Sequence, residues 1–274
     1  MIAGRFILKA RWINIVFPLL CISSTWGNKY PIVLSTSDWG MVEENEIQAV
    51  LNSTWMIFIP FSESIKSSEI QVERTVSSPI TFYKKSKDGK YRIGLSANNR
   101  NWCQYVFQFA HELGHIICGM KKGDQSNQWF EESLCEAASL FALNRISETW
   151  EKSPPYPDWK SFAIEFKIYR EARIQNSSYP ENFHLPSWWE KNRSLLSKNS
   201  SLRKENLWVA ITLLNLIEKD PGVAWSACRW LNHLKSSQIK SFENYLNDWK
   251  NSCQKIEQKE FVHEIMYAFG LSRS

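Results

Sequence analysis

Several features that mark common protein classes are scarce or absent in this sequence. Glycine and proline each occur only 10 times in 274 residues, and no repeat or low-complexity tract interrupts the chain. Both facts argue against a collagen-like, repetitive or disordered protein. The six cysteines include no CxxC pair, so a zinc knuckle built on cysteines is not indicated. We expect an ordinary globular chain that is long enough to bury a substantial core.

The apolar run near the N-terminus is too short to span a bilayer comfortably. It covers Trp12–Ser23 and follows three basic residues, whereas a transmembrane helix needs about 20 apolar residues. A basic segment followed by a short apolar run is typical of a secretory signal. We therefore expect residues 1–27 to be a signal peptide and the protein to be secreted or periplasmic. An uncleaved membrane anchor and a lipid anchor at Cys21 are the alternatives, and no stable membrane span is expected.

An excess of one charge is also missing once this segment is set aside. The first 27 residues hold three of the 33 basic residues and none of the 28 acidic ones. The remaining chain therefore carries 30 basic and 28 acidic residues, a net charge of only +2. This balance gives no basic stripe of the kind that binds nucleic acid, so no nucleic-acid partner is expected.

What is present is a short strand-rich region followed by a long helical one. Apolar periodicity predicts one helix and then three strands, at 44–58, 70–76, 80–85 and 91–97. The Asp88-Gly89 pair predicts a hairpin between the last two strands. Further helices are predicted at 102–119, 127–149, 158–175, 187–197, 203–219, 221–235, 239–252 and 256–269.

This order of elements indicates an α+β fold with a small antiparallel sheet. Proline-bearing stretches punctuate the helical half, and the first of them covers 153–158. We therefore expect a catalytic core at 28–150 and a mostly α-helical part at 151–274 that forms the other wall of a cleft.

The segment 109–119, FAHELGHIICG, places His111 and His115 on one predicted helix. Residues four apart stand above one another on a helix, so both imidazoles can reach a single point. Such a pair is typical of a zinc site, because Zn2+ accepts imidazole nitrogen at about 2.0–2.1 Å. Glu112, one position round the helix, is expected to act as general base on a zinc-activated water that attacks a carbonyl. The HExxH pattern therefore predicts hydrolysis at one zinc ion.

A second amphipathic segment, 129–143, supplies carboxylates for a third ligand. Its sequence is WFEESLCEAASLFAL, and Glu131, Glu132 and Glu136 follow His115 by 16, 17 and 21 residues. Glu132 and Glu136 share a helix face, so spacing alone leaves both open as ligands. The one that does not bind zinc is expected to orient a histidine. Glu131 is interpreted as a surface residue.

Here the chain resembles the gluzincin metallopeptidases, whose third ligand is a glutamate on the helix after the HExxH helix. The letters WFEE resemble the W-x-x-E of the zinc aminopeptidases, and ESLC with the alanines that follow resembles the ImmA/IrrE-type peptidases. The resemblance covers roughly 91–145. It implies a zincin-like core and one Zn2+ per chain, with Glu132 as the third ligand and Glu136 as the alternative.

The resemblance also implies how substrate is bound. In zincins an edge strand before the HExxH helix pairs with extended substrate through backbone hydrogen bonds. The expected substrate-binding residues are Gly94, Leu95, Ser96 and Ala97. An ordinary inner strand is the alternative interpretation of this segment.

Gluzincins usually bring a tyrosine or histidine from the helical part to the developing oxyanion. His184 is the favoured residue for this role, although no spacing selects it. The other residues considered are Tyr156, Tyr169 and Arg203.

Gly114 and two cysteines near the motif carry structural expectations. Glycine is less favourable than alanine inside a helix by about 1 kcal/mol. We therefore expect another backbone, such as a neighbouring strand, to approach closely at Gly114. Cys118 and Cys135 each follow a proposed ligand by three residues, so a disulfide between them is a hypothesis.

Together these patterns predict a secreted zinc metallopeptidase that acts on peptides or protein segments. A catalytically silent zincin-like binding protein and a helical interaction protein are the alternatives. The intact Glu112 argues against the first alternative, because a silent binder needs no base. The glutamate-bearing second helix argues against the other.

Overall fold

The computed structural model describes residues 31–35, 37–61, 65, 69–121, 123–234 and 239–271. The expected signal peptide, residues 1–27, lies outside this part of the chain, so export stays a prediction. Within the described residues, no helix is both long and apolar enough to cross a membrane.

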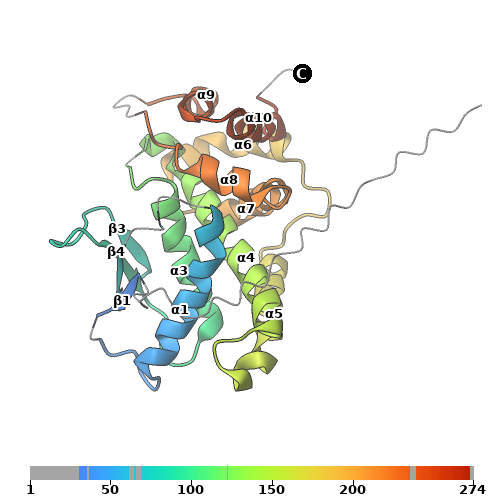
Figure 1. The fold of residues 1–274 in the computed structure, drawn as a ribbon. Helices are drawn as coiled ribbons and strands as arrows, with labels where there is room; N and C mark the ends of the chain where they lie inside the picture. The colour runs from blue at the N-terminus through green and yellow to red at the C-terminus, as the bar shows by residue number, and fades with distance from the viewer. Residues whose placement is uncertain are drawn as a thin grey trace, which may run out of the picture.

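A four-stranded mixed sheet lies at one side of the molecule (Figure 1). Its order is β1-β2-β4-β3. The parallel pairs are β1 with β2 and β2 with β4, and β3 is antiparallel to β4. The strands are β1 (Ile32–Leu34), β2 (Ile70–Arg74), β3 (Ile80–Phe82) and β4 (Tyr91–Leu95).

The α+β class is confirmed, but the expectation of an antiparallel sheet is wrong. A parallel pair needs a crossover connection, and α1 (Glu44–Phe58) supplies it between β1 and β2. The strand β1 was not predicted, because three residues are too few to show an alternating pattern. The hairpin of β3 and β4 around Asp88-Gly89 is confirmed, with Gly89 at a φ of +83°.

Two helices that pack side by side form the centre of the fold. They are α3 (Trp102–Ile117) and the long α4 (Gln128–Lys152), which also packs along α5 and α7 (Figure 1). At Gly114 of α3, an added Cβ would lie 3.0 Å from Cys135 Sγ and 3.1 Å from Cys135 Cα. The expected close approach at Gly114 is therefore confirmed, but the approaching backbone is that of α4 and not of a strand.

The helices after α4 follow the predicted pattern closely. The predicted helix at 221–235 is the exception, because α8 ends at Cys228 and hydrogen-bonded turns follow it. These helices are α5 (Ala163–Asn176), α6 (Leu185–Lys198), α7 (Arg203–Ile217), α8 (Pro221–Cys228), α9 (Phe242–Ser252) and α10 (Ile256–Ala268). Short 3-10 turns cover Ile59–Phe61, Gln125–Asn127 and Pro157–Phe162.

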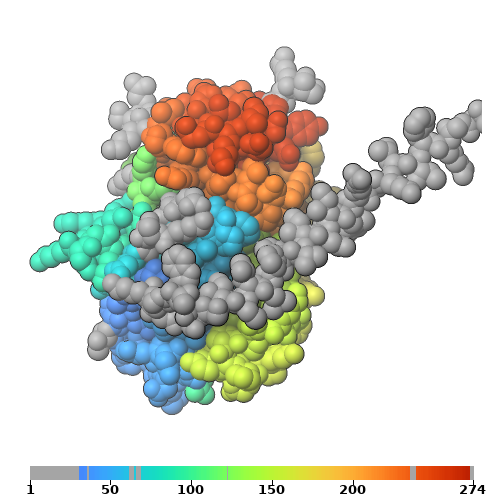
Figure 2. Space-filling model, in the orientation of Figure 1, coloured from blue at the N-terminus to red at the C-terminus, as the bar shows by residue number. Residues whose placement is uncertain are grey.

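A single hydrophobic core joins the sheet side to the C-terminal helices. It runs from Ile32 on β1 to Phe269 beyond α10, and Trp129, Trp150, Trp225 and Trp249 are fully buried in it. Figure 2 shows the C-terminal helices covering one end of the molecule and the β3–β4 hairpin projecting to one side. The α4 helix ends at Lys152, beside the predicted boundary, and the division into two parts stays a prediction.

Candidate metal centre

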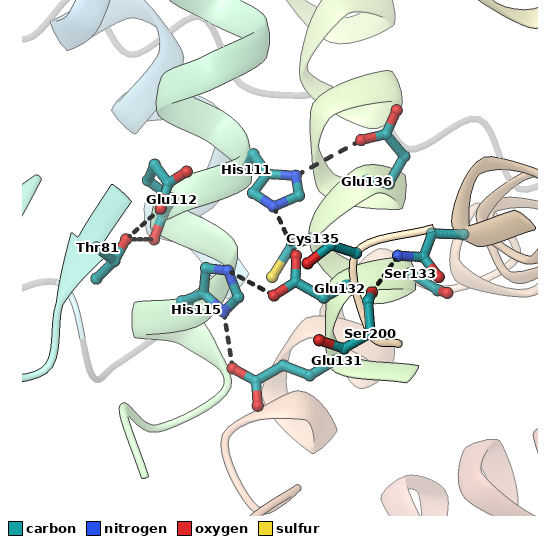
Figure 3. A network of polar contacts seen from close by, with 12 residues as sticks. Thr81, His111, Glu112, His115, Glu131, Glu132, Ser133, Cys135, Glu136 and Ser200 are labelled. Atoms are coloured by element: carbon teal, nitrogen blue, oxygen red, sulfur yellow. Dashed lines mark hydrogen bonds and ion pairs between the residues drawn. The ribbon is translucent and has the colours of Figure 1, made fainter. Parts of the chain in front are cut away.

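The α3 helix places His111 and His115 on one face. Their ring centroids lie 5.4 Å apart, with the rings inclined at 70°. Both side chains are largely buried, with 20% of His111 and 14% of His115 exposed. The spacing of four residues therefore brings both imidazoles to one place, where they are directed toward α4 (Figure 3).

The α4 helix brings the carboxylate of Glu132 between the two imidazoles (Figure 3). Its Oε2 lies 3.2 Å from Nε2 of His111, and its Oε1 lies 3.8 Å from Nε2 of His115. The two carboxylate oxygens of Glu132 therefore each face one imidazole nitrogen across the contact between α3 and α4. Of the two glutamates that spacing left open, Glu132 is the one that faces both Nε2 atoms.

Cys135, one turn after Glu132, is a donor that the sequence interpretation did not include. The ligand atoms of His111, His115 and Cys135 lie within 4.8 Å of one another, so these three residues could hold a metal ion. Burial raises the pKa of the Cys135 thiol well above its ordinary value, and the neighbouring Cys118 adds to this effect. The thiol is therefore a neutral donor in the structure.

The carboxylate of Glu132 differs from this thiol in its charge. Burial opposes its ionisation, but the hydrogen bond to His111 and the charges of His115 and His111 outweigh burial and lower the pKa of Glu132. A divalent cation needs anionic donors to offset the loss of its hydration. Glu132 meets this requirement as the structure stands, while Cys135 completes the group of three residues whose ligand atoms lie close enough to hold a metal ion.

The Nδ1 atom of His115 is bound on the side away from Glu132. It lies 2.8 Å from Oε1 of Glu131. Glu131 Oε2 accepts a hydrogen bond of 2.6 Å from the side-chain amide of Asn232, and Asn232 Oδ1 accepts one of 3.0 Å from the hydroxyl of Tyr245. Glu131, interpreted from the sequence as a surface residue, is only 4% exposed, so that interpretation is wrong.

The Nδ1 atom of His111 faces a different carboxylate. It lies 3.6 Å from Oε2 of Glu136, and Glu136 Oε1 lies 3.3 Å from Nη2 of Arg173 on α5. The Arg173 guanidinium also stacks on the ring of Phe107, 3.8 Å from its centroid. Both histidines thus have Nδ1 turned to a carboxylate, which orients Nε2 toward Glu132.

The carboxylates raise the basicity of both histidines. Burial opposes protonation of His111, but its hydrogen bonds to Glu132 and Glu136 outweigh burial and raise its pKa to about 10. Burial also opposes protonation of His115, and the hydrogen bond and charge of Glu131 raise its pKa to about 9. The centre is therefore rich in negative charge that two protons offset, and a divalent cation in their place would restore the same balance.

Glu112 lies on the side of α3 that faces the sheet. Its carboxylate Oε2 and its backbone carbonyl each lie 2.8 Å from Oγ1 of Thr81, whose hydroxyl is the donor. Figure 3 shows Glu112 directed toward Thr81 on β3, away from the α4 glutamates. Glu112 is 4% exposed and Thr81 is 8% exposed, so the contact is buried. The sequence analysis did not single out Thr81.

Tyr83 is a second residue near the centre that the sequence analysis did not single out. It lies just beyond the end of β3, two residues after Thr81, and 49% of it is exposed. Burial raises the pKa of Tyr83 to about 12, and the charges of Glu131 and Glu132 add to this effect. Both Thr81 and Tyr83 lie in the predicted strand 80–85, and this was the available sequence signal.

The expected substrate strand requires a correction. β4 has a partner on each side, since Gly94 pairs with Glu73 of β2 and with Ile80 of β3. The backbone N–H groups of Ser96 and Ala97 both donate to Oε1 of Gln108. Gly94, Leu95, Ser96 and Ala97 therefore do not form an edge, and the inner-strand alternative is correct. β3 lies at this end of the described sheet.

The structure also bears on the expected roles of His184 and of the cysteine pair. The imidazole of His184 accepts a hydrogen bond from the backbone N–H of Ser187 and caps the start of α6, where it is exposed. Among the described residues the hydrogen bonds of His184 are to Ser187, and its expected oxyanion role stays a prediction. The described cysteines are all free, so the hypothesised Cys118–Cys135 disulfide is not formed. The thiols of Cys135 and Cys228 instead lower the pKa of Cys118 well below its ordinary value, which places the three sulfur atoms beside one another.

Comparison of the chain with protein-family models, curated proteins and solved structures finds no match. The functional assignment therefore depends on the side chains of the centre themselves.

Proposed function

We propose that the chain is a secreted, zinc-dependent metallopeptidase of the gluzincin type. His111, His115 and Glu132 would hold the zinc ion, and Glu112 would act as general base. One observation carries the proposal: two Nε2 atoms and one carboxylate converge from α3 and α4, while other carboxylates face both Nδ1 atoms. Incidental surface histidines would not require this arrangement.

The donor set fits zinc in type and charge. Zn2+ binds imidazole nitrogen and carboxylate oxygen, and a catalytic site uses three protein ligands with one open position. When bound, zinc would act as a Lewis acid and lower the pKa of a coordinated water toward about 7. One zinc ion per chain is proposed.

Glu112 is the residue of this chain that would transfer the proton. Its Oε2 accepts the hydrogen bond of Thr81, which leaves Oε1 to take a proton from the attacking water. The same carboxylate would then deliver the proton to the leaving nitrogen. Because Glu112 points toward β3, we propose that the scissile bond lies between β3 and the two histidines.

The edge strand β3 is the proposed substrate strand in place of β4. Among the described strands it is paired on one side only, and Thr81 links it directly to Glu112. An extended peptide or protein segment could pair along Ile80–Phe82 by backbone hydrogen bonds, as expected for a zincin.

A second function is favoured by the position of Cys135. If its thiol loses a proton and joins the two histidines and Glu132, the metal has four protein ligands and no open position. Such a closed site would make the protein a metal-stabilised binding module without hydrolytic activity. Cys135→Ser separates the two cases, because it weakens zinc binding strongly in a closed site and little in an open one.

The first test is metal analysis of the purified protein. We expect one zinc ion per chain, lost in His111→Ala and in Glu132→Ala and retained in Glu112→Gln, which keeps the shape of the side chain. Absence of stoichiometric zinc from correctly folded wild-type protein would exclude both metal functions and leave the helical interaction protein.

The second test is cleavage of a mixed peptide library by the zinc-loaded protein. We expect cleavage by the wild type, and we expect Glu112→Gln to lower the rate by about 10²–10⁴-fold, the usual contribution of a general base. Cleavage that is equally fast in Glu112→Gln would remove Glu112 from the mechanism.

A further inference from the structure

The buried side-chain amide of Asn232 connects the C-terminal part of the chain with the metal centre. Asn232 lies in the hydrogen-bonded turns that follow α8, and only 4% of it is exposed. The loop between α3 and α4 leaves room for it at Gly123, where an added Cβ would lie 2.4 Å from Asn232 Oδ1. Two segments more than 100 residues apart in the chain thus meet around this side chain.

The hydrogen bonds of this amide run in one direction from end to end. The Tyr245 hydroxyl donates to Asn232 Oδ1, so the amide Nδ2 is the atom that donates to Glu131. Glu131 then has Oε1 left to accept from Nδ1 of His115. With one proton held on Nδ1, the nitrogen of His115 that is left for a metal is Nε2, the atom that faces Glu132, because the cation would take the place of the second proton.

Burial keeps water from replacing the partners in these hydrogen bonds. Glu131, Asn232 and Tyr245 are 4%, 4% and 5% exposed, so water does not compete with them effectively. Burial and the charge of Glu131 raise the pKa of Tyr245 well above its ordinary value, so its hydroxyl keeps the proton that it donates. Tyr245 and Asn232 therefore each have one role available to them in these hydrogen bonds.

We propose that Asn232 and Tyr245 are positioning residues of the metal centre, which fix Glu131 so that His115 presents Nε2 to the metal. The inference rests on the metal site of the proposed function. It gives the C-terminal part, in which the sequence offers no motif, a part in metal binding that acts through Glu131 and His115.

The test is zinc affinity, measured by competition with a chromophoric chelator. In Asn232→Leu we expect affinity to fall about 10–100-fold, as for other residues that orient a metal ligand. In Tyr245→Phe we expect a smaller fall, because the amide remains. The matched controls are Gln258→Leu, another buried amide of the C-terminal helices, and Tyr105→Phe, whose hydroxyl has no hydrogen-bond partner among the described residues.

The controls separate positioning from general support of the fold. Gln258→Leu is expected to lower the unfolding temperature of the metal-free protein while leaving zinc affinity unchanged, and Tyr105→Phe to leave zinc affinity unchanged. Zinc affinity of both Asn232→Leu and Tyr245→Phe within about twofold of the wild type would overturn the proposal.

A second readout covers the case in which Asn232→Leu does not fold. Nitrogen-15 NMR of the zinc-loaded wild type should show His115 bound through Nε2 and protonated at Nδ1, with faster solvent exchange of the Nδ1 proton in Tyr245→Phe. A His115 that is protonated at Nε2 would overturn the inference. A wild type without zinc would instead refute the metal site itself, so the two failures are distinguishable.

Discussion

His115 and His111 present the same nitrogen to Glu132, but the rest of the molecule holds them in different ways. On the His115 side, hydrogen bonds of 2.8, 2.6 and 3.0 Å run through Glu131 and Asn232 to Tyr245. All three partners are buried. This side ends in neutral groups and extends into the C-terminal helices.

On the His111 side, the carboxylate of Glu136 lies 3.6 Å from Nδ1 and pairs with Arg173 at 3.3 Å. The Arg173 side chain is 32% exposed, so solvent screens the pair. This side ends in a cation and stays within α3, α4 and α5.

The comparison shows that two physically different arrangements can place an acceptor at Nδ1 of a histidine. Each ligand needs an acceptor at Nδ1 so that Nε2 is free for the metal. The buried hydrogen bonds on the His115 side orient the imidazole in one direction. Losing one of these partners leaves a buried polar group unpaired, which carries a large free-energy penalty. The partly exposed ion pair of Glu136 with Arg173 orients its histidine with less geometric constraint, and its loss carries a smaller penalty. We therefore expect substitutions on the His115 side to have the larger effects.

The largest effect is expected where the two sides meet. Glu132→Ala should abolish stoichiometric zinc binding, because it removes a carboxylate that faces both imidazoles. Glu136→Ala should retain a zinc ion at lower affinity, because Glu136 contacts only Nδ1 of His111. Metal analysis after dialysis compares the two. Loss of zinc in Glu136→Ala with retention in Glu132→Ala would exchange their roles.

The next largest effect is expected when the two sides are compared through variants that keep the shape of the side chain. Glu131→Gln should lower zinc affinity about 10–100-fold, and Glu136→Gln should lower it less. Glu131→Gln should also lower the free energy of unfolding by about 1–3 kcal/mol, because a buried hydrogen bond loses a charged partner. Chelator competition and urea unfolding measure the two quantities. Equal losses in both variants would remove the distinction between the sides.

Gly114→Ala tests the packing of α3 against α4 on which both sides depend. Alanine favours the helix by about 1 kcal/mol, but the added Cβ would meet Cys135 at 3.0–3.1 Å. We expect a net destabilisation of about 1–3 kcal/mol from overpacking, seen in urea unfolding. Adding Cys135→Ala removes the sulfur atom but leaves the nearby α4 backbone in place, so the double variant should recover only part of the loss. A stabilised Gly114→Ala protein would contradict the close approach.

The smallest effect is expected for Arg173→Met. It removes a screened ion pair, so the free energy of unfolding should fall by about 1 kcal/mol or less. Zinc affinity should change less than in Glu131→Gln, and added salt should shrink the difference from wild type. Arg170→Met, one turn earlier on α5, is the control. An effect on zinc affinity larger than that of Glu131→Gln would reverse the order of the two sides.

The sequence was most informative where local spacing decides geometry. The i, i+4 spacing of His111 and His115 is sufficient to bring two imidazoles together, because a helix fixes that distance. The choice of Glu132 needed a resemblance, since spacing alone did not separate it from Glu136. The helices of the C-terminal half were predictable from their 3.6-residue periodicity.

What the sequence did not reveal depends on interactions between distant segments. Asn232 and Tyr245 reach Glu131 across about 100 residues without a motif, so no local pattern marks them. Strand order in a sheet is likewise a tertiary property, and β4 was taken for an edge because the parallel pairing with β2 leaves no sequence signal. The proximity of Cys135 to the imidazoles follows from the close packing at Gly114.

X-ray absorption spectroscopy of the zinc-loaded wild type tests the His111, His115 and Glu132 centre most directly. We predict nitrogen and oxygen neighbours only, at about 2.0–2.2 Å, with imidazole scattering from two histidines. A sulfur neighbour at about 2.3 Å would show that Cys135 closes the site and would contradict the proposed catalytic centre.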